Sequence, residues 1–537
     1  MLPFPTICHA LPTDPIARRC RSSAWPLLLL LAIATARGDE TQRFYVRQYK
    51  IDGGKRLSNL EAGEAVYPYL GPGRTPDDVE NARAALEKVY HDKGFQTVSV
   101  QIPEQDPRRG IIRLQVVEGK VARLKVSGAK WHLPSRIRRE VPSLAEGSVP
   151  DFKQVEREIV AVNRLADRRV TPDLKPGAEP GTVDIELKVE DELPLHGSLE
   201  LNNRYSADTT PLRVNGSLSY ANLFQLGHTL GASVQIAPEN TDDALVYSGY
   251  YLARVSDKAS LMVNATKQDS DISTLGGAAV AGRGEILGLR AMIDMPGSEK
   301  FYQSFNYGID YKNFEEDVVI GKDVISSPIE YYPISANYSA GWVRDKHFTE
   351  LNTSLNFHLR GMGDDESAYG DKRYNASGSF IFLRADAAHT RDIKGGAQVF
   401  GKVQGQVSGG PLINSEQFSG GGLGTARGYL ESTLLGDNGI FITAELRSPT
   451  LIGKGDTSPN PKDELRFHAF YDGGITGIYD PLPGQKKRAG LSSIGVGSRL
   501  RVREHYNASV DVAMPLIEQT NADDGSIRIT FRGWAEF

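Results

Sequence analysis

Residues 527–537 read Ile-Arg-Ile-Thr-Phe-Arg-Gly-Trp-Ala-Glu-Phe, so apolar and polar side chains alternate up to an aromatic last residue. A period of two is typical of a β-strand that has one face in an apolar environment and the other in water. The pattern recurs between separators rich in Gly, Asn, Asp and Pro, at residues 212–220, 230–236, 247–255 and 304–312. Residues 193–537 are therefore predicted to form antiparallel β structure.

The composition excludes several classes of protein. The 537 residues carry 62 Lys+Arg and 67 Asp+Glu, a net charge of −5, so there is no basic excess for a nucleic-acid partner. The two cysteines, Cys8 and Cys20, leave the rest of the chain without disulfides or cysteine ligands. The ten histidines show no metal-ligand spacing, and no G-x-S-x-G motif is present. We therefore predict no enzyme, no cofactor and no metal site.

The N-terminus predicts export. Arg18, Arg19 and Arg21 precede an apolar run at residues 25–36 that ends in Ala-Thr-Ala, the order of a signal peptide, which we place at residues 1–36. The run is too short for a membrane helix, which needs about 20 apolar residues. An exported chain without such a helix can enter a bilayer only as a closed β-barrel.

A soluble β-sandwich would alternate in the same way as a barrel. The signal peptide, the lack of cysteine in the mature chain and the aromatic C-terminus favour the barrel. At about twenty residues for a strand and its connection, residues 193–537 predict a transmembrane antiparallel β-barrel of about 16 strands.

Two small α/β domains are predicted before the barrel, at residues 44–120 and 121–192, after a short segment at residues 37–43. In the first, a strand at residues 44–51 is followed by a helix that Thr75 caps and Gly94 ends, and by two alternating strands. In the second, Asp151 caps the corresponding helix. Free edges of such sheets can accept an extended peptide by β-augmentation, whereas the alternative is that the domains only support the barrel.

An ordered set of motifs then resembles one family, the outer-membrane transporters of two-partner secretion, or haemolysin secretion and activation (TpsB-type) proteins. They belong to a barrel superfamily with periplasmic POTRA domains. The POTRA motifs are Pro103, Gln105, Glu118 and Gly119 in the first domain, and Asn163, Arg164 and Leu165 in the second. In the barrel, the matching residues are Arg427, Gly428 and Tyr429, and then Phe470, Asp472, Gly473 and Gly474.

The resemblance implies export through the barrel. The POTRA domains would capture a large secreted partner exoprotein, expected to be β-helical, and the partner would cross the outer membrane unfolded and without ATP. The sequence contains no G-x-x-x-x-G-K-[ST] phosphate-binding loop, which agrees with transport without ATP. Other expected partners are outer-membrane lipid and the barrel-assembly machinery, for which Phe531 and Phe537 would form the C-terminal assembly signal. The exported partner could be a haemolysin, an adhesin or a contact-dependent toxin, and the alternative function is a barrel-assembly insertase of the same superfamily.

The resemblance also implies a loop near residues 416–437 that folds into the lumen, with Arg427 at its tip and Asp472 as its salt-bridge partner. Ala426 stands where the family usually has valine. From the sequence alone, a solvated arginine in a Gly-rich surface loop remains the alternative. Since residues 37–43 are too few for a pore-spanning helix, we expect the inward loop and lumen side chains to close the pore.

Overall fold

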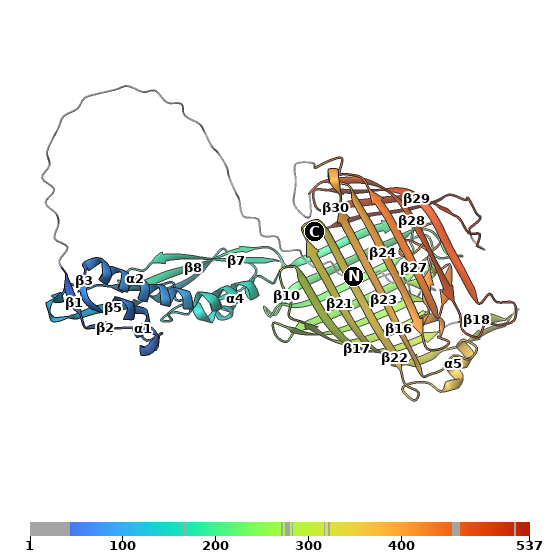
Figure 1. Ribbon diagram of the computed structural model, residues 1–537. Helices are drawn as coiled ribbons and strands as arrows, with labels where there is room; N and C mark the ends of the chain where they lie inside the picture. Colours follow the sequence, from blue (N-terminus) through green and yellow to red (C-terminus); the bar gives the residue numbers. More distant parts are fainter. Residues whose placement is uncertain are drawn as a thin grey trace, which may run out of the picture. The chain divides into compact units, whose positions relative to one another are not determined.

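The computed structural model describes residues 43–165, 167–269, 272–273, 280–281, 283–315, 317–320, 323–453, 462–519 and 522–537. The predicted signal peptide and residues 37–42 lie outside the described residues. The chain divides into two compact units between Leu193 and Pro194 (Figure 1). Among the described residues, no helix has the length and apolar character needed to cross a membrane.

The first small domain has a three-stranded sheet in the order β2-β5-β4 and a separate β1-β3 pair. Thr75 caps α2 with its side chain, and Gly94 ends it at a φ of 109°, as the sequence predicts. The predicted strand 44–51 is broken at Arg47, because its first part pairs with β3. The elements are β1 Phe44–Val46, β2 Gln48–Asp52, α1 Asn59–Val66, β3 Gly71–Arg74, α2 Pro76–Lys93, β4 Val98–Gln101 and β5 Ile111–Glu118.

The second small domain repeats this plan with the sheet order β6-β8-β7. Asp151 caps α4 as predicted, by accepting from the N–H of Lys153. The sequence did not predict β7, since Pro172 and Pro176 interrupt its strand pattern, but an edge strand tolerates proline. The elements are β6 Lys120–Ser127, α3 Pro134–Glu140, α4 Phe152–Val162, β7 Arg168–Pro176 and β8 Thr182–Asp191.

A buried carboxylate makes the second domain sensitive to acid. Burial acts to raise the pKa of Asp191, but hydrogen bonds from the His132 ring and from the N–H groups of Lys130, Trp131 and His132 outweigh it and lower the pKa. Its contribution to stability is thus present above the unfolded-state value of about 3.9 and lost as pH falls through the lower folded-state pKa.

This loss can be measured on a fragment of residues 43–193. We expect the urea concentration at its unfolding midpoint to decrease as the pH is lowered below about 4, and to decrease less steeply in the Asp191→Asn variant. Equal slopes in both proteins would contradict this.

The second unit is a closed antiparallel barrel. β20 and β21 both pair with β17 and form one wall strand, so the wall has sixteen strands. These are β9 Leu195–Asn202, β10 Arg213–Leu223, β11 His228–Ile236, β12 Leu245–Arg254, β13 Ala259–Asp269, β16 Arg283–Asp294, β17 Phe301–Glu315, β20 Ile329–Tyr331 with β21 Ile334–Arg344, β22 His347–His358, β23 Phe380–Asp392, β24 Gln398–Ser408, β27 Asn438–Arg447, β28 Glu464–Gly477, β29 Arg488–Val502, β30 Tyr506–Pro515 and β31 Arg528–Glu536.

The rims of the barrel differ in their connections. We call the rim where β9 begins and β31 ends the proximal rim, because the chain enters there from the small domains, and the opposite one the distal rim. Several long connections lie at the distal rim, among them the one that carries α5 Glu366–Lys372 between β22 and β23 (Figure 1). The connection between β24 and β27, residues 409–437, begins and ends at this rim too.

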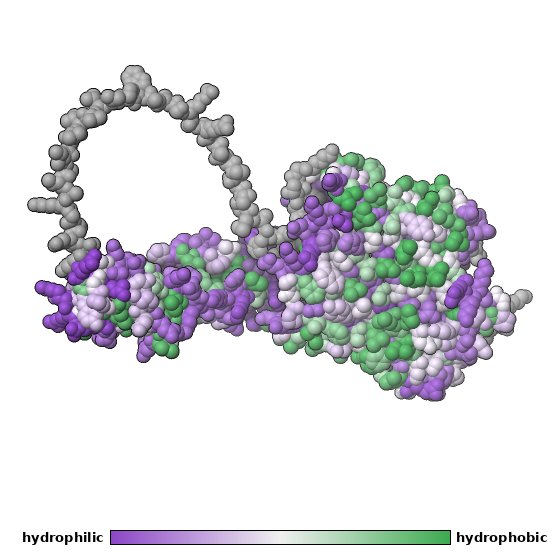
Figure 2. Space-filling view, viewed as in Figure 1, coloured by the Kyte–Doolittle hydropathy of each residue, from purple (hydrophilic) through white to green (hydrophobic). Residues whose placement is uncertain are grey.

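The outer face of the wall is apolar. Large apolar side chains that alternate with inward polar ones are exposed along the strands, among them Leu287, Leu289, Ile440 and Ile442. In Figure 2, apolar side chains gather in patches over the barrel wall, whereas the small domains are mostly polar. This is the surface that a transmembrane barrel presents to lipid.

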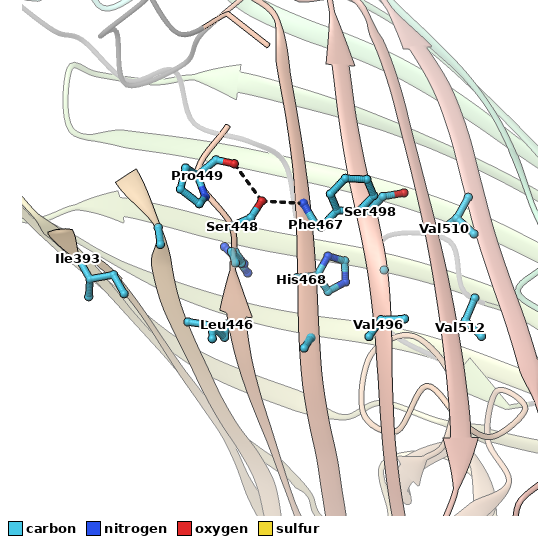
Figure 3. A pocket seen from close by; sticks show the side chains of 14 residues that line it. Ile393, Leu446, Ser448, Pro449, Phe467, His468, Val496, Ser498, Val510 and Val512 are labelled. Atoms are coloured by element: carbon cyan, nitrogen blue, oxygen red, sulfur yellow. Dashed lines mark hydrogen bonds between the residues drawn. The ribbon is translucent and has the colours of Figure 1, made fainter. Parts of the chain in front are cut away.

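A hollow of about 750 Å³ lies in the wall over β27–β30, near the proximal rim (Figure 3). Its lining includes Leu446, Phe467, Val496 and Val510, which are all on the exposed apolar face. Among the lining residues, the Ser448 hydroxyl accepts from the N–H of Phe467 at 3.0 Å (Figure 3). The hollow therefore belongs to the lipid-facing surface and is not a candidate for the functional site.

Candidate functional site

Residues 409–437, which we call the inward loop, fold back into the barrel. They contain η7 Asn414–Glu416, β25 Phe418–Gly420 and β26 Leu434–Gly436. Ala426 and Tyr429 are fully buried near the loop tip. The tip contacts side chains of β27, β28 and β30 that alternate with the exposed apolar ones, and these side chains face the lumen.

All three guanidinium nitrogens of Arg427 donate hydrogen bonds to carboxylates of the barrel wall. Its Nε and Nη2 donate to the two carboxylate oxygens of Asp472 at 2.8 and 2.9 Å, and its main-chain N–H donates to Asp472 at 3.1 Å. Its Nη1 donates to Glu445 at 2.7 Å. The side chains of Arg427, Asp472 and Glu445 are 4%, 1% and 2% exposed, which does not fit a solvated surface arginine. The guanidinium carbon lies 3.4 Å from the centre of the Phe470 ring, a cation–π contact.

Further charged side chains surround the pair of Arg427 and Asp472. Glu445 also accepts from Arg447 at 2.7 Å and from Arg499 at 3.1 Å. Asp511 on β30 lies 3.7 Å from the Arg427 guanidinium, and its Oδ1 is 2.6 Å from Nε2 of His468. Each buried charge thus has a partner, as a water-poor site requires.

Sequence reasoning missed Glu445, Asp511 and His468 as parts of this site. The signal that could have found them is alternation: each occupies the lumen-facing parity of its strand, where a charge needs a partner. Glu445 lies on β27, which directly follows the inward loop, and the pairing of β27, β28, β29 and β30 in that order places all three residues on the wall that the loop tip contacts.

Glycines allow the loop tip to lie against the wall. A Cβ on Gly428 would lie 2.7 Å from Cβ of Ser493 and 3.0 Å from the Pro515 nitrogen. The Tyr429 hydroxyl reaches the carbonyls of Ser492 and Ile517 at 2.9 and 2.7 Å. On the wall, a Cβ on Gly474 would clash with the Phe441 ring, while Gly473 lies beneath Tyr471.

The predicted motif residues of the first domain fix its own backbone. The Gln105 amide bonds both the N–H and the carbonyl of Arg113, at 2.7 and 2.9 Å. Glu118 accepts from the N–H groups of Lys55 and Arg56, and Gly119 leaves no room for a Cβ against the Thr97 carbonyl. Pro103 is exposed in the connection between β4 and β5.

The motif of the second domain and the C-terminal residues lie apart from the lumen site. The Asn163 amide bonds both main-chain groups of Val170, Arg164 is exposed, and Leu165 is half-buried. Phe531 is half-buried on β31, where β31 closes the barrel against β9. The main chain of Phe537 extends this seam by exchanging two hydrogen bonds of 3.0 Å with Gly197.

The sheet edges of the small domains are less open than the sequence predicts. On the outer edge of β4, side chains of α2 occupy the main-chain groups. Glu87 accepts from the N–H of Val100, Arg83 donates to the Val100 carbonyl, and His91 contacts the Val98 carbonyl at 2.9 Å. This edge cannot pair with another strand unless α2 moves.

The edges of the second domain are occupied in part. Asn163 covers Val170 on β7, and the next positions that face the same edge include Pro172 and Pro176, which have no N–H to offer. On β6, the N–H of Val121 donates to the Ser148 carbonyl, and the Val121 carbonyl accepts from Gly147. The first half of β6 is therefore closed.

The outer edge of β2 differs. Gln48 donates to the Gly110 carbonyl, so Gln48 faces β5 and the main-chain groups of Tyr49 and Ile51 face outward. Within the described part of the chain, no group outside the sheet bonds them. Of the two outer edges of the three-stranded sheet, β2 is thus the one that retains unpaired N–H and carbonyl groups among the described residues.

Comparison with known proteins assigns the architecture. A family model for the ShlB-type POTRA domain matches residues 44–119. A second model, for the haemolysin secretion/activation protein ShlB/FhaC/HecB, matches residues 181–500, more than half of the chain. The chain belongs to the haemolysin secretion/activation family.

Relatives in this family are distant in sequence. The outer membrane transporter CdiB of Escherichia coli O6:K15:H31 is 25% identical over 446 residues, which covers 78% of this chain and 72% of the relative. The transporter CdiB of Dickeya dadantii is 22% identical over 429 residues, with coverages of 75% and 72%.

Solved structures share the fold. CdiB from Escherichia coli matches with a TM-score of 0.60 at 19% identity, over 94% of this chain and 93% of that chain. BamA from Haemophilus ducreyi lacking POTRA domains 1–3 matches with a TM-score of 0.56 at 13% identity, over 92% and 100%. The predicted fold, POTRA domains followed by an antiparallel barrel of about 16 strands, is confirmed.

Family membership also fixes the location. This member of the family lies in the outer membrane with its POTRA domains in the periplasm, as predicted. Because β9 follows the POTRA domains directly, the proximal rim is periplasmic and the distal rim is extracellular.

Proposed function

We propose that this protein is a non-enzymatic pore that takes up an unfolded partner exoprotein in the periplasm and passes it through the barrel lumen to the cell surface without ATP. The observation that carries the proposal is the buried attachment of Arg427 to three lumen-facing carboxylates. A loop held this firmly inside a sixteen-strand barrel both narrows the passage and offers the moving chain a defined wall. The salt bridge between Arg427 and Asp472 would fix the inward loop in the position that secretion requires.

The test of this function uses the partner. Cells that produce a large β-helical exoprotein from a neighbouring reading frame should display it to external protease only when they also produce this protein. If the exoprotein is displayed equally without it, the proposal fails.

We further propose that the partner is captured at β2 of the first POTRA domain. An unpaired strand edge binds an extended segment through main-chain hydrogen bonds, which do not require a particular sequence. Leu60 of α1, which contacts β2, is 71% exposed, and Tyr67, the residue that follows α1, is 73% exposed. The occupant that fits is an extended partner segment with alternating apolar side chains, one row of which would cover these two residues.

Site-specific cross-linking tests the position of capture. A photoreactive residue at Lys50 on β2 should cross-link the partner, whereas one at Ser99 on the occupied β4 should give at least about tenfold less adduct. Both side chains are exposed, so access alone predicts equal yields. Equal yields, or preference for Ser99, would contradict capture at β2.

For membrane insertion, we propose that Phe531 and Phe537 serve as the C-terminal signal read by the barrel-assembly machinery. The Phe537 side chain is 66% exposed at the periplasmic rim, which leaves its ring accessible to such a factor. The apolar outer wall would then be covered by outer-membrane lipid.

A further inference from the structure

A second buried ion pair lies at the extracellular rim, away from Arg427. Asp437, the last residue of the inward loop, is fully buried and bonds Arg373, which follows α5. The two Nη groups of Arg373 donate to the two oxygens of the Asp437 carboxylate, the second at 2.8 Å. This two-pronged geometry is the strong form of an arginine–carboxylate contact.

The pair connects three separate loops. Besides Arg373, the Asp437 carboxylate accepts from the N–H of Leu412 at 2.9 Å, from Gln417 at 3.3 Å and from the N–H of Tyr479 at 2.7 Å. Arg373 in turn donates to the carbonyls of Leu412 and Tyr479 at 2.7 and 3.0 Å. Leu412 and Gln417 lie in the inward loop, and Tyr479 lies in the connection between β28 and β29.

Apolar packing supports the same connection. Tyr369 of α5 is fully buried and lies in one cluster with Tyr331 and Phe380 of the wall. The inward loop contributes Leu412 and Ile413 to this cluster. The α5 loop, residues 359–379, is therefore packed onto the base of the inward loop and is not a free surface loop.

We infer that Arg373 is a positioning residue that clasps the α5 loop to the base of the inward loop and keeps the extracellular mouth closed at rest. The inference rests on the proposed export function, since a chain leaving the lumen must pass this rim. Arg427 anchors the tip of the inward loop and Asp437 is a second anchor, at its base; in the same loop, Glu416 pairs with Lys312 and Glu431 pairs with Arg204. Export requires the second anchor to open, because Asp437 ties the loop base to two other extracellular connections.

The first test is the conductance of the full-length protein in planar bilayers. Arg373→Gln should raise the fraction of time spent open by about tenfold or more, the factor expected when a charge-assisted hydrogen bond is lost. The control is Arg360→Gln in the same loop, whose 3.0 Å pair with Glu366 is 67% and 40% exposed and should not matter. Heat-modifiable gel migration shows whether each variant is folded.

The second test closes the mouth covalently and does not depend on the stability of Arg373→Gln. Asn375 and Asp480 belong to the α5 loop and the β28–β29 connection, and their side chains are 3.2 Å apart. In a background without Cys8 and Cys20, Asn375→Cys/Asp480→Cys joined by a short thiol cross-linker should stop secretion of the partner, while the untreated protein secretes it.

The outcomes separate the two proposals. Unchanged conductance of folded Arg373→Gln, or normal secretion by the cross-linked protein, would overturn the clasp. Failure of the untreated double-cysteine protein and of the unmodified protein to secrete would instead overturn the export function.

Discussion

Arg427→Ala should lower secretion of the partner by at least about tenfold, while the barrel still assembles. The substitution leaves Asp472 and Glu445 buried without their common cation, and breaking a buried pair in this way costs about 3–5 kcal/mol. That cost falls on the bound position of the inward loop, because the wall strands keep their own ladder. The measurement is the amount of partner in the medium or at the surface, normalised to heat-modifiable barrel.

Arg427→Lys is the matched variant. It retains the positive charge but cannot bond both Asp472 oxygens and Glu445 at once, so secretion should remain well below that of the wild type. Wild-type secretion by Arg427→Ala would show that the anchor has no role in export. Loss of the folded barrel in both variants would show that the pair serves assembly instead.

Gly428→Val should reduce secretion to a similar degree without removing any charge. The new Cβ would lie 2.7 Å from Cβ of Ser493, and the valine methyl groups would require still more space. The loop tip must then move away from the wall, which pulls Arg427 from Asp472. Secretion and folded barrel are measured as above.

Gly424→Val is its control in the same loop. A Cβ there meets no atom within 4 Å, so this variant should secrete normally. If Gly428→Val also secretes normally, close contact of the tip with the wall is not required. If both variants fail, any bulky residue in the loop is harmful and the contact at Gly428 is not special.

Much of the fold could be predicted because local patterns determine it. The alternation in residues 527–537 depends only on which face of a strand meets lipid, and α2 begins and ends where Thr75 and Gly94 place their caps. α1 was missed, although Ser58 and Glu61 form a capping box, because the helix is only eight residues long. β7 was missed because its prolines are compatible only with an edge position, which the sequence does not reveal.

The lumen site could be predicted only in part. The motif resemblance named Arg427 and Asp472, and the structure places them together. The site also includes Glu445, Asp511 and His468, but their place in it depends on which strands face the loop tip in the folded barrel. That arrangement is a property of the three-dimensional strand register. The same holds for Arg373 and Asp437, which are 64 residues apart in the chain.

The central claim is that the partner passes through the lumen, and neighbouring residues of β24 test it most directly. Lys402 faces the lumen, and Val403 is exposed on the outer wall. With a partner stalled by a fused, stably folded domain, a photoreactive residue at Lys402 should cross-link the partner, and one at Val403 should cross-link only lipid. Adducts at Val403 with none at Lys402 would contradict transport through the barrel.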